Sequence, residues 1–481
     1  TIHPPASGQC CTGRWLAGSL TIMKYRSYCY RMLILIFLGG GLSGCRSFDA
    51  RQARSDQAES FRRQLADKTE RWLAKPLDLR DCLRIALTNS YPARQADLQR
   101  TLAKLGKDTA FANFLPQVTV SASATHNRFP TTYGGMVFER LNHSGASLDV
   151  DLPILTPSAW FLYAARRQNV KVAEISAHYV RQTICLEVTR AYYTCLVQED
   201  LIRALRTQQE AAMETFDRVE GLTAEGLSAK WEREQALAQL RSRNSELAQA
   251  ERALTTAKGD LLVLMGLPPD ADVTLSGKTE PAPPGGETLE ELVIRALSEH
   301  PELAMADREV VIRDHQVRQA FCDFLPQLSG YWSGSYLDNS IYDRLNNWAL
   351  GLAGTWNVFD GLANVANYRA AKVNRTETGL KREYLFLTVM LEVIRAEAGI
   401  RDAADAFRTA QQSYRAYELK SADYRAKMRE GLIPVKDSLE AEAERDAAQV
   451  TVVQTRYQEA IARATLDLAM GVTALPEGGI E

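Results

Sequence analysis

FANFLPQVTVSASATHN, at residues 111–127, returns 210 residues later as FCDFLPQLSGYWSGSYL, at residues 321–337. In both copies the FLPQ turn separates a helical pattern from a stretch that reads as a strand. The match extends upstream, because LRDCLRIALTNSYP at 79–92 corresponds to LEELVIRALSEHP at 289–301. A period this long indicates one internal duplication and not a solenoid of short repeats.

The downstream ends of the two copies have equal lengths. Gly226-Leu227 recurs as Gly431-Leu432 and Met265-Gly266 as Met470-Gly471, and the Gly-to-Met separation is 39 positions in each copy. We therefore place the first repeat at 79–265 and the second at 288–471. Residues 266–287, rich in Pro and Gly, are predicted to be a linker, and residues 472–481 a C-terminal tail.

Each copy contains a predicted β-hairpin, at 118–155 and at 328–358, with a polar, Gly-rich loop centred on 130–135 in the first. The apolar residues of one strand, Leu148, Val150, Leu152 and Ile154, alternate with Ser147, Asp149, Asp151 and Pro153. In the second copy Leu350, Leu352, Trp356 and Val358 share one face. Strands of about ten residues with one apolar face have the length and pattern of strands that cross a bilayer at a tilt.

Long helices follow both hairpins. Residues 158–223 and 363–428 contain no Pro and almost no Gly, so each is predicted to be a helix roughly 100 Å long. Apolar residues recur at 4,3 spacing, for example Val389, Val393, Ala396 and Ile400, and Leu240, Leu247, Leu254 and Leu261 are spaced by sevens. Sustained heptads predict coiled-coil packing. Gly226 and Gly431 are placed to end each long helix before an antiparallel return helix.

The N-terminal region has the layout of a secretory signal. Residues 23–45 contain a basic stretch, an apolar core at 32–38 and small residues, and Met23 is the expected start, with 1–22 as upstream translation. Leu42-Ser43-Gly44-Cys45 resembles the lipobox of bacterial lipoproteins. That resemblance implies removal of 1–44, acylation of Cys45, including palmitate, and a lipid-anchored segment at 45–78. Arg46 follows the Cys where an Asp would favour inner-membrane retention, so the outer membrane is expected.

Composition excludes several classes of protein. The net charge of −2 and pI of about 6.4 argue against a nucleic-acid binder. A mean hydropathy of −0.25 and a single long apolar run exclude a polytopic helical membrane protein. Cys82, Cys185, Cys195 and Cys322 show no CxxC spacing and are expected to be packed thiols, with no disulfide framework.

These features together resemble the TolC-type outer-membrane efflux family, and the resemblance covers nearly all of 79–471. It implies a mainly α fold with membrane β-strands. In that fold, long coiled-coil helical hairpins form an α-helical periplasmic tunnel, and four strands per chain enter a trimeric 12-stranded β-barrel. Four strands cannot close a membrane barrel, so a homotrimer is expected. The alternation then directs Leu148, Val150 and Leu152 to outer-membrane lipid and Asp149 and Asp151 to the barrel lumen.

The resemblance also implies site residues. Asp437 and Glu440, with Glu232 in the first copy, correspond to acids of the periplasmic entrance, although Asp437 has an alternative role as a helix-dipole partner in a first turn. The expected docking tips for a periplasmic adaptor protein are Gly226, Leu227, Ser228, Gly431, Leu432 and Ile433. Lys230 and Trp231 near the first tip have no assigned role.

No catalytic constellation is present. The six His residues are scattered, and Walker, GxGxxG and nucleophile-elbow motifs are missing, so we expect no enzyme activity, no metal and no cofactor. The expected function is a passive outer-membrane conduit of a tripartite efflux or type I secretion system, served by an adaptor and an inner-membrane pump. The alternatives are a periplasmic adaptor lipoprotein and a purely structural coiled-coil lipoprotein. An adaptor would have one helical hairpin flanked by small β-domains.

Overall fold

The computed structural model describes residues 49–129, 131–133, 136–139, 141–277, 287–338 and 346–473. The predicted signal peptide, Cys45, linker residues 278–286 and tail residues 474–481 lie outside the described residues. The chain divides into two units, Thr1–Asp67 and Lys68–Glu481. Helix α2 (Ala50–Trp72), which begins in the first unit, is strongly polar and buries none of its residues.

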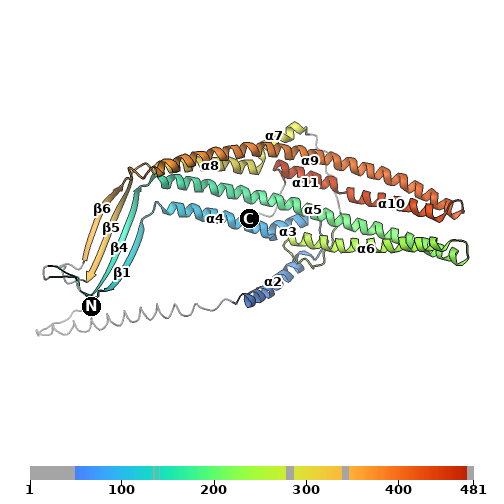
Figure 1. Cartoon of the computed structure of the whole chain (residues 1–481), viewed down its shortest axis with the longest axis horizontal. Helices are drawn as coiled ribbons and strands as arrows, with labels where there is room; N and C mark the ends of the chain where they lie inside the picture. Colours follow the sequence, from blue (N-terminus) through green and yellow to red (C-terminus); the bar gives the residue numbers. More distant parts are fainter. Residues whose placement is uncertain are drawn as a thin grey trace, which may run out of the picture. The chain divides into compact units, whose positions relative to one another are not determined.

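The second unit contains the duplicated helices. The first copy has α3 (Leu79–Asn89), α4 (Tyr91–Ala112), α5 (Pro157–Ala224) and α6 (Lys230–Leu264). The second has α7 (Leu289–Glu299), α8 (Pro301–Cys322), α9 (Ala363–Arg429), α10 (Val435–Thr455) and α11 (Gln458–Met470). The tips of the helical hairpins lie at the opposite end of these helices from the sheet (Figure 1).

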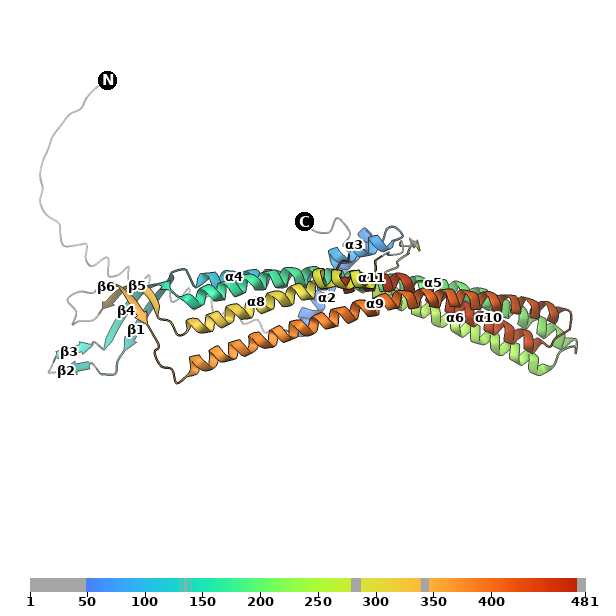
Figure 2. The same ribbon diagram turned by 90° about the horizontal axis from the view of Figure 1, so that it is seen from above.

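The two long helices confirm the heptad prediction. Helix α5 has 68 residues and α9 has 67. Val188 and Cys195 of α5 and Val389 and Val393 of α9 are fully buried, while α5 packs along α4, α6 and α8, and α9 along α8, α10 and α11 (Figure 2). The 4,3 spacing therefore corresponds to the observed side-by-side packing.

The return segment differs between the copies, because α6 is continuous whereas α10 is separated from α11 at Arg456–Tyr457. The side chain of Tyr457 is buried, stacks on Tyr193 with ring centroids 5.5 Å apart, and donates through its hydroxyl to Asp200 at 3.0 Å. A side chain drawn into the core in this way interrupts the regular helix.

The main sheet joins both predicted hairpins in the order β1-β4-β5-β6, with every pair antiparallel. Its strands are β1 (Gln117–His126), β4 (Asn142–Leu155), β5 (Gln327–Asp338) and β6 (Asn346–Thr355). Strand β6 ends before Trp356 and Val358, which were expected in the strand; the Trp356 indole instead donates to the Phe324 carbonyl at 3.1 Å. A further hairpin, β2 (Thr131–Tyr133) and β3 (Met136–Glu139), forms within the expected loop.

The corner between sheet and helices has the same aromatic cluster in each copy. Phe114 meets Tyr163 edge to face at 6.2 Å, and Phe324 meets Tyr368 in the same way at 6.3 Å. Each pair also contacts a phenylalanine at the end of the preceding helix, Phe111 or Phe321. The repeated FLPQ turn is therefore held by equivalent ring contacts.

The largest apolar core surrounds α3 and the middle of α5. Cys82 and Cys195 are fully buried there, and burial raises the pKa of each thiol to about 12. Cys185 and Cys322 are also buried, and all four thiols are free, so the prediction of packed thiols is confirmed. The start of the expected linker belongs to this core, because Val273 is buried and Leu275 forms a bridge with Leu77.

Among the helices of the described residues, none combines the length and the apolar character that a membrane span requires.

We expect Gly266→Ala to lower the free energy of unfolding by about 2 kcal/mol or more. Gly266 has a left-handed φ of +67°, and an added Cβ would lie 2.6 Å from the Asn89 carbonyl oxygen; the left-handed conformation alone costs about 1–2 kcal/mol for other residues. Thermal unfolding by circular dichroism in detergent measures the change. The control is Gly221→Ala, which sits inside α5 with open space around it and should stabilise by up to about 1 kcal/mol. Equal effects of the two substitutions would contradict this account.

Candidate functional site: sheet faces, helical tips and a buried ionic network

One face of the sheet is polar. Residues directly opposite in the ladder share a face, and Asp149 is in register with Thr119 and Ser333. The Asp149 carboxylate accepts hydrogen bonds from the hydroxyls of Ser147 and Ser333 at 2.8 and 2.5 Å. Asp151, the second predicted lumen residue, lies on the same face, so the structure brings both acids together on this surface.

The other face is apolar across all four strands. Its residues include Val118, Val120, Leu148, Val150, Leu152, Trp332, Trp348, Leu350 and Leu352. Many are exposed, with Val120 at 76% and Leu350 at 72%. A continuous exposed apolar surface of this kind indicates contact with lipid or with another protein.

Each outer strand of the sheet is directly connected to a helix that has an exposed apolar side. Strands β1 and β6 are the outer strands; α4 leads into β1, and α9 follows β6. Helix α4 exposes Leu98, Leu102 and Leu105, and α9 exposes Leu380, Tyr384, Leu387 and Leu391. These residues recur at 3 and 4 spacing, so each edge helix presents an apolar stripe suited to a coiled-coil partner.

The helical tips are two equivalent turns. Gly226 and Gly431 are left-handed, with φ of +74° and +70°. The following amides, of Leu227 and Leu432, donate back to the carbonyls of Leu222 and Lys427 at 2.8 and 2.9 Å, which completes a Schellman motif and confirms the predicted helix ends. Both leucine side chains are exposed. Ser228 and Ile433, the remaining predicted docking residues, are half-buried.

The three predicted entrance acids lie at the starts of the two return helices. Glu232 caps α6, because its carboxylate accepts from the Ser228 hydroxyl at 2.5 Å and from the Ala229 amide at 3.0 Å. Asp437 is half-buried in the first turn of α10. Glu440 is exposed one turn later, with the Lys436 ammonium 3.5 Å away. The structure therefore gives Glu232 a local capping role that the sequence comparison of the two copies did not reveal.

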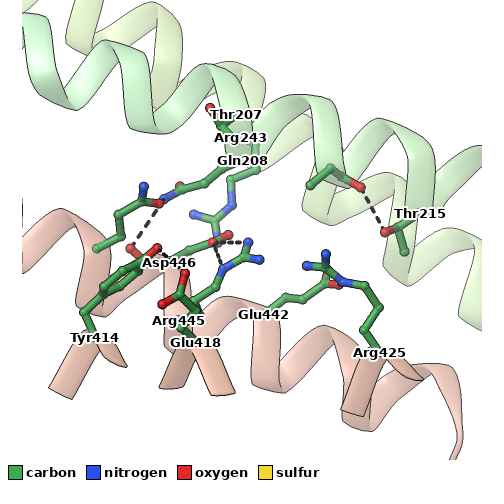
Figure 3. A network of polar contacts seen from close by, with 12 residues as sticks. Thr207, Gln208, Thr215, Arg243, Tyr414, Glu418, Arg425, Glu442, Arg445 and Asp446 are labelled. Atoms are coloured by element: carbon green, nitrogen blue, oxygen red, sulfur yellow. Dashed lines mark hydrogen bonds and ion pairs between the residues drawn. The ribbon is translucent and has the colours of Figure 1, made fainter. Parts of the chain in front are cut away.

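The sequence did not predict a network of ion pairs and hydrogen bonds that joins the two helical hairpins (Figure 3). Asp446 of α10 is 3% exposed and pairs with Arg243 of α6 at 3.1 Å and with neighbouring Arg445 at 2.6 Å. Gln208 of α5 donates to Gln449 of α10 at 2.9 Å. Buried charges and amides thus connect residues more than 200 positions apart.

Two further buried acids lie near this network, one within the second hairpin and one between the two hairpins. Glu442 accepts from Arg425 at 3.1 Å within the second hairpin. Asp200 of α5 pairs with Arg456 at 2.8 Å, where α10 and α11 meet, and is contacted by Arg203 on its own helix. In the sequence, these residues are recognisable only as charged side chains close to the apolar heptad positions. The same pattern is expected for a helix face exposed to solvent, so it does not identify a buried network.

Within the described residues, no group of three or more His, Cys, Asp or Glu side chains is arranged to hold a metal ion.

One comparison with known proteins identifies a family. The family model for outer membrane efflux proteins matches residues 83–267 and 292–472. No curated protein gives a significant sequence match.

Solved structures share the fold at low sequence identity. The CmeC outer membrane channel of Campylobacter jejuni superposes with a TM-score of 0.74 at 18% identity, covering 83% of this chain and 87% of CmeC. The outer membrane protein VceC of Vibrio cholerae gives 0.72 at 17% identity, covering 82% and 96%. The open state of the MtrE outer membrane channel of Neisseria gonorrhoeae gives 0.68 at 17% identity, covering 83% and 91%.

The Arg243–Asp446 pair is expected to couple strongly in a double-mutant cycle. Removing one partner leaves the other charge buried, so Asp446→Ala should destabilise the protein by about 3 kcal/mol, and Arg243→Ala in that background should cost much less. Chemical unfolding of the four variants measures the coupling energy. The exposed pair Lys381–Glu377, 2.7 Å apart, is the control and should couple by less than about 1 kcal/mol. Additive effects at Arg243 and Asp446 would contradict a buried network.

Proposed function

Because the chain belongs to the outer membrane efflux protein family, we propose that it is the outer-membrane channel component of a tripartite efflux or type I secretion system. In this proposal three copies enclose a passive conduit from the periplasm to the exterior. An inner-membrane pump supplies the energy, and a periplasmic adaptor links it to the helical tips. No cofactor or catalytic step is required.

The observation that carries the proposal is the four-stranded sheet with one apolar and one polar face. Backbone groups at an open sheet edge cannot be left unpaired in hydrocarbon. Strands β1 and β6 therefore need partners if the apolar face contacts lipid, and β6 of one copy next to β1 of another provides them. The polar face, with Asp149 and Asp151, then lines the interior.

The strand count supports three copies of the chain. Two copies would give eight strands, a barrel just wide enough for its own side chains, whereas three give twelve and leave room for a conduit. The apolar stripes on α4 and α9 lie at the same edges as β1 and β6, so the same contact between copies pairs strands and covers both stripes. A helical tunnel in the periplasm would thereby continue the barrel.

The sequence and this geometry also support a cellular arrangement. Acylation of Cys45 would anchor the chain in the outer membrane, since several acyl chains together hold a protein stably. The exposed Leu227 and Leu432 at the two tips would meet the adaptor. The alternatives, an adaptor or a purely structural coiled-coil lipoprotein, leave the exposed apolar sheet face unexplained.

The entrance would lie at the tips. Three copies would bring Asp437 and Glu440 into rings of carboxylates that attract cations. Glu232 is already engaged in capping α6. The second repeat of each chain would therefore supply the acids that face the pore.

Leu102→Glu together with Leu387→Glu should dissociate the assembly. Each substitution places a charge on an edge stripe that the assembly would bury, so the amount of trimer should fall by at least about tenfold, or about 1.4 kcal/mol. Amine-reactive crosslinking and native mass spectrometry in detergent measure the oligomer. Gln99→Glu, which adds a charge beside the stripe on α4, is the control and should remain trimeric. A wild-type chain that stays monomeric would overturn the proposed function.

Asp437→Ala with Glu440→Ala should weaken block of the channel by divalent cations by at least about tenfold. A single carboxylate 4 Å from a unit charge contributes about 1 kcal/mol even in water, and the double variant removes six carboxylates from a trimer. Conductance in planar bilayers, titrated with a divalent salt, measures the effect.

The matched control for these acids is Glu290→Ala, in the first turn of α7 and outside both tips. This substitution should leave the block by divalent cations unchanged. If the double variant is blocked like the wild type, Asp437 and Glu440 are not part of the entrance.

A further inference from the structure

A groove runs along the second helical hairpin, between α9 and α10. It encloses about 630 Å³. Its walls are built of small and polar residues, among them Asp405, Thr409 and Ser413 from α9 and Glu444, Ala448 and Thr451 from α10.

The internal duplication identifies the counterpart of this groove. At the 205-residue offset, Asp405 and Ser413 correspond to Asp200 and Gln208 of α5. Likewise, Ala448 and Thr451 correspond to Arg243 and Glu246 of α6. The equivalence extends to local contacts, because Asp200–Arg203 and Asp405–Arg408 are the same pair at i,i+3. The groove is therefore the second copy's version of the α5–α6 surface.

In the first repeat of the chain this surface is occupied. Helix α10 and the start of α11 lie on it, with Asp446 paired to Arg243, Gln449 bonded to Gln208, and Arg456 paired to Asp200. The occupant is thus the return segment of the other copy of the repeat.

In the second copy the equivalent surface is bare within the described residues. The side chain of Asp200 is 4% exposed, whereas that of Asp405 is 70% exposed. Two equivalent surfaces of one duplicated unit differ because one has its neighbour in the same chain and the other does not.

We propose that the α9–α10 groove seats helix α6 of an adjacent copy of this chain, with Arg252 of that copy paired to Asp405. The inference rests on the proposed function, since it requires copies arranged in a ring. Beyond the proposed function, it names the helix that fills the groove and the ion pair that fixes the position of this helix along the groove.

The same offset indicates which face of α6 would enter the groove. Asp446, Gln449, Arg456 and Tyr457 correspond to Arg241, Asn244, Glu251 and Arg252, and all four are exposed. The Glu251 carboxylate pairs with Arg206 of its own chain at 3.1 Å. Arg252 is therefore the residue of this face that would pair with Asp405 of the neighbouring chain. Arg252 stands where Tyr457 reaches Asp200.

Charge complementarity supports this occupant. The groove carries Asp405 and Glu444, of which Glu444 is paired with Lys420 of its own chain. The incoming face carries Arg241 and Arg252, together with Glu251 paired to Arg206. In the contact within one chain the signs are partly reversed, with Arg243 in the groove and Asp446 on the incoming helix. The two incoming helices differ in charge at one equivalent position, Asp446 against Arg241, and this difference would help each surface to select the correct neighbour.

The test is disulfide trapping in the full-length chain. Asp405→Cys with Arg252→Cys, oxidised with copper phenanthroline, should give denaturing-gel bands of two and three chains in at least about half of the protein. Gln208→Cys with Gln449→Cys is the matched control and should crosslink within one chain, without a change in chain number. The native thiols Cys82, Cys185, Cys195 and Cys322 are buried and should not interfere.

Charge exchange gives an independent readout. Arg252→Asp should raise the monomer fraction by at least about tenfold, and Asp405→Arg in the same chain should restore the trimer. Asp402→Arg, which makes the same change one turn away outside the groove lining, should not restore it.

The two proposals fail separately. A stable wild-type trimer that gives no crosslink between positions 405 and 252 overturns this inference and leaves the channel intact, whereas a wild-type chain that is monomeric in the membrane overturns the proposed function. Rapid maleimide labelling of Asp405→Cys in the assembled trimer would also overturn the inference, because it would show that the groove is open or serves another partner.

Discussion

The open hydrogen-bonding edges of β1 and β6 are the constraint on which the structure depends. An unpaired amide or carbonyl in hydrocarbon costs several kcal/mol, so a sheet whose apolar face enters lipid cannot keep such edges. In water the same sheet would expose Val120 and Leu350. Joining copies edge to edge satisfies both demands at once, and the apolar stripes on α4 and α9 lie along the same edges. The fold of one chain thus specifies how further chains must be added.

Duplication explains why one chain can make two kinds of neighbour contact. The helices of both copies retain matching lengths, tips and corner aromatics, so their backbones offer equivalent surfaces. The side chains on these surfaces diverge: Asp446 is buried against Arg243, whereas its counterpart Arg241 is exposed. We infer that the divergence distinguishes a contact within the chain from a contact between chains. A chain with two identical halves could not make this distinction.

The sequence predicted the elements well and their long-range contacts poorly. Helices expected at 158–223 and 363–428 are observed at Pro157–Ala224 and Ala363–Arg429, because residues without Pro continue a helix until a left-handed Gly ends it. Strand β6 was shorter than expected, since Trp356 turns toward the Phe324 carbonyl, and β2–β3 escaped notice because its turn residues resemble a loop. The Arg243–Asp446 pair was missed because helical periodicity does not specify which distant helix a charged face meets.

The distribution of packing along the hairpins fits an entrance at the tips. Around α3 and α7 the helices bury large residues such as Ile85, Leu261 and Val389. Toward the tips, Val219 of α5 and Leu439 of α10 are buried, but the other buried apolar residues of α6 and α10 include Ala236, Ala441 and Ala448, and alanine removes little apolar surface from water. Buried ion pairs and amide contacts lie in this region, and a buried ion pair adds little net stability because the cost of desolvating both charges offsets their attraction. Because less apolar area holds the tip hairpins together than holds the core, their relative packing can change at a lower free-energy cost.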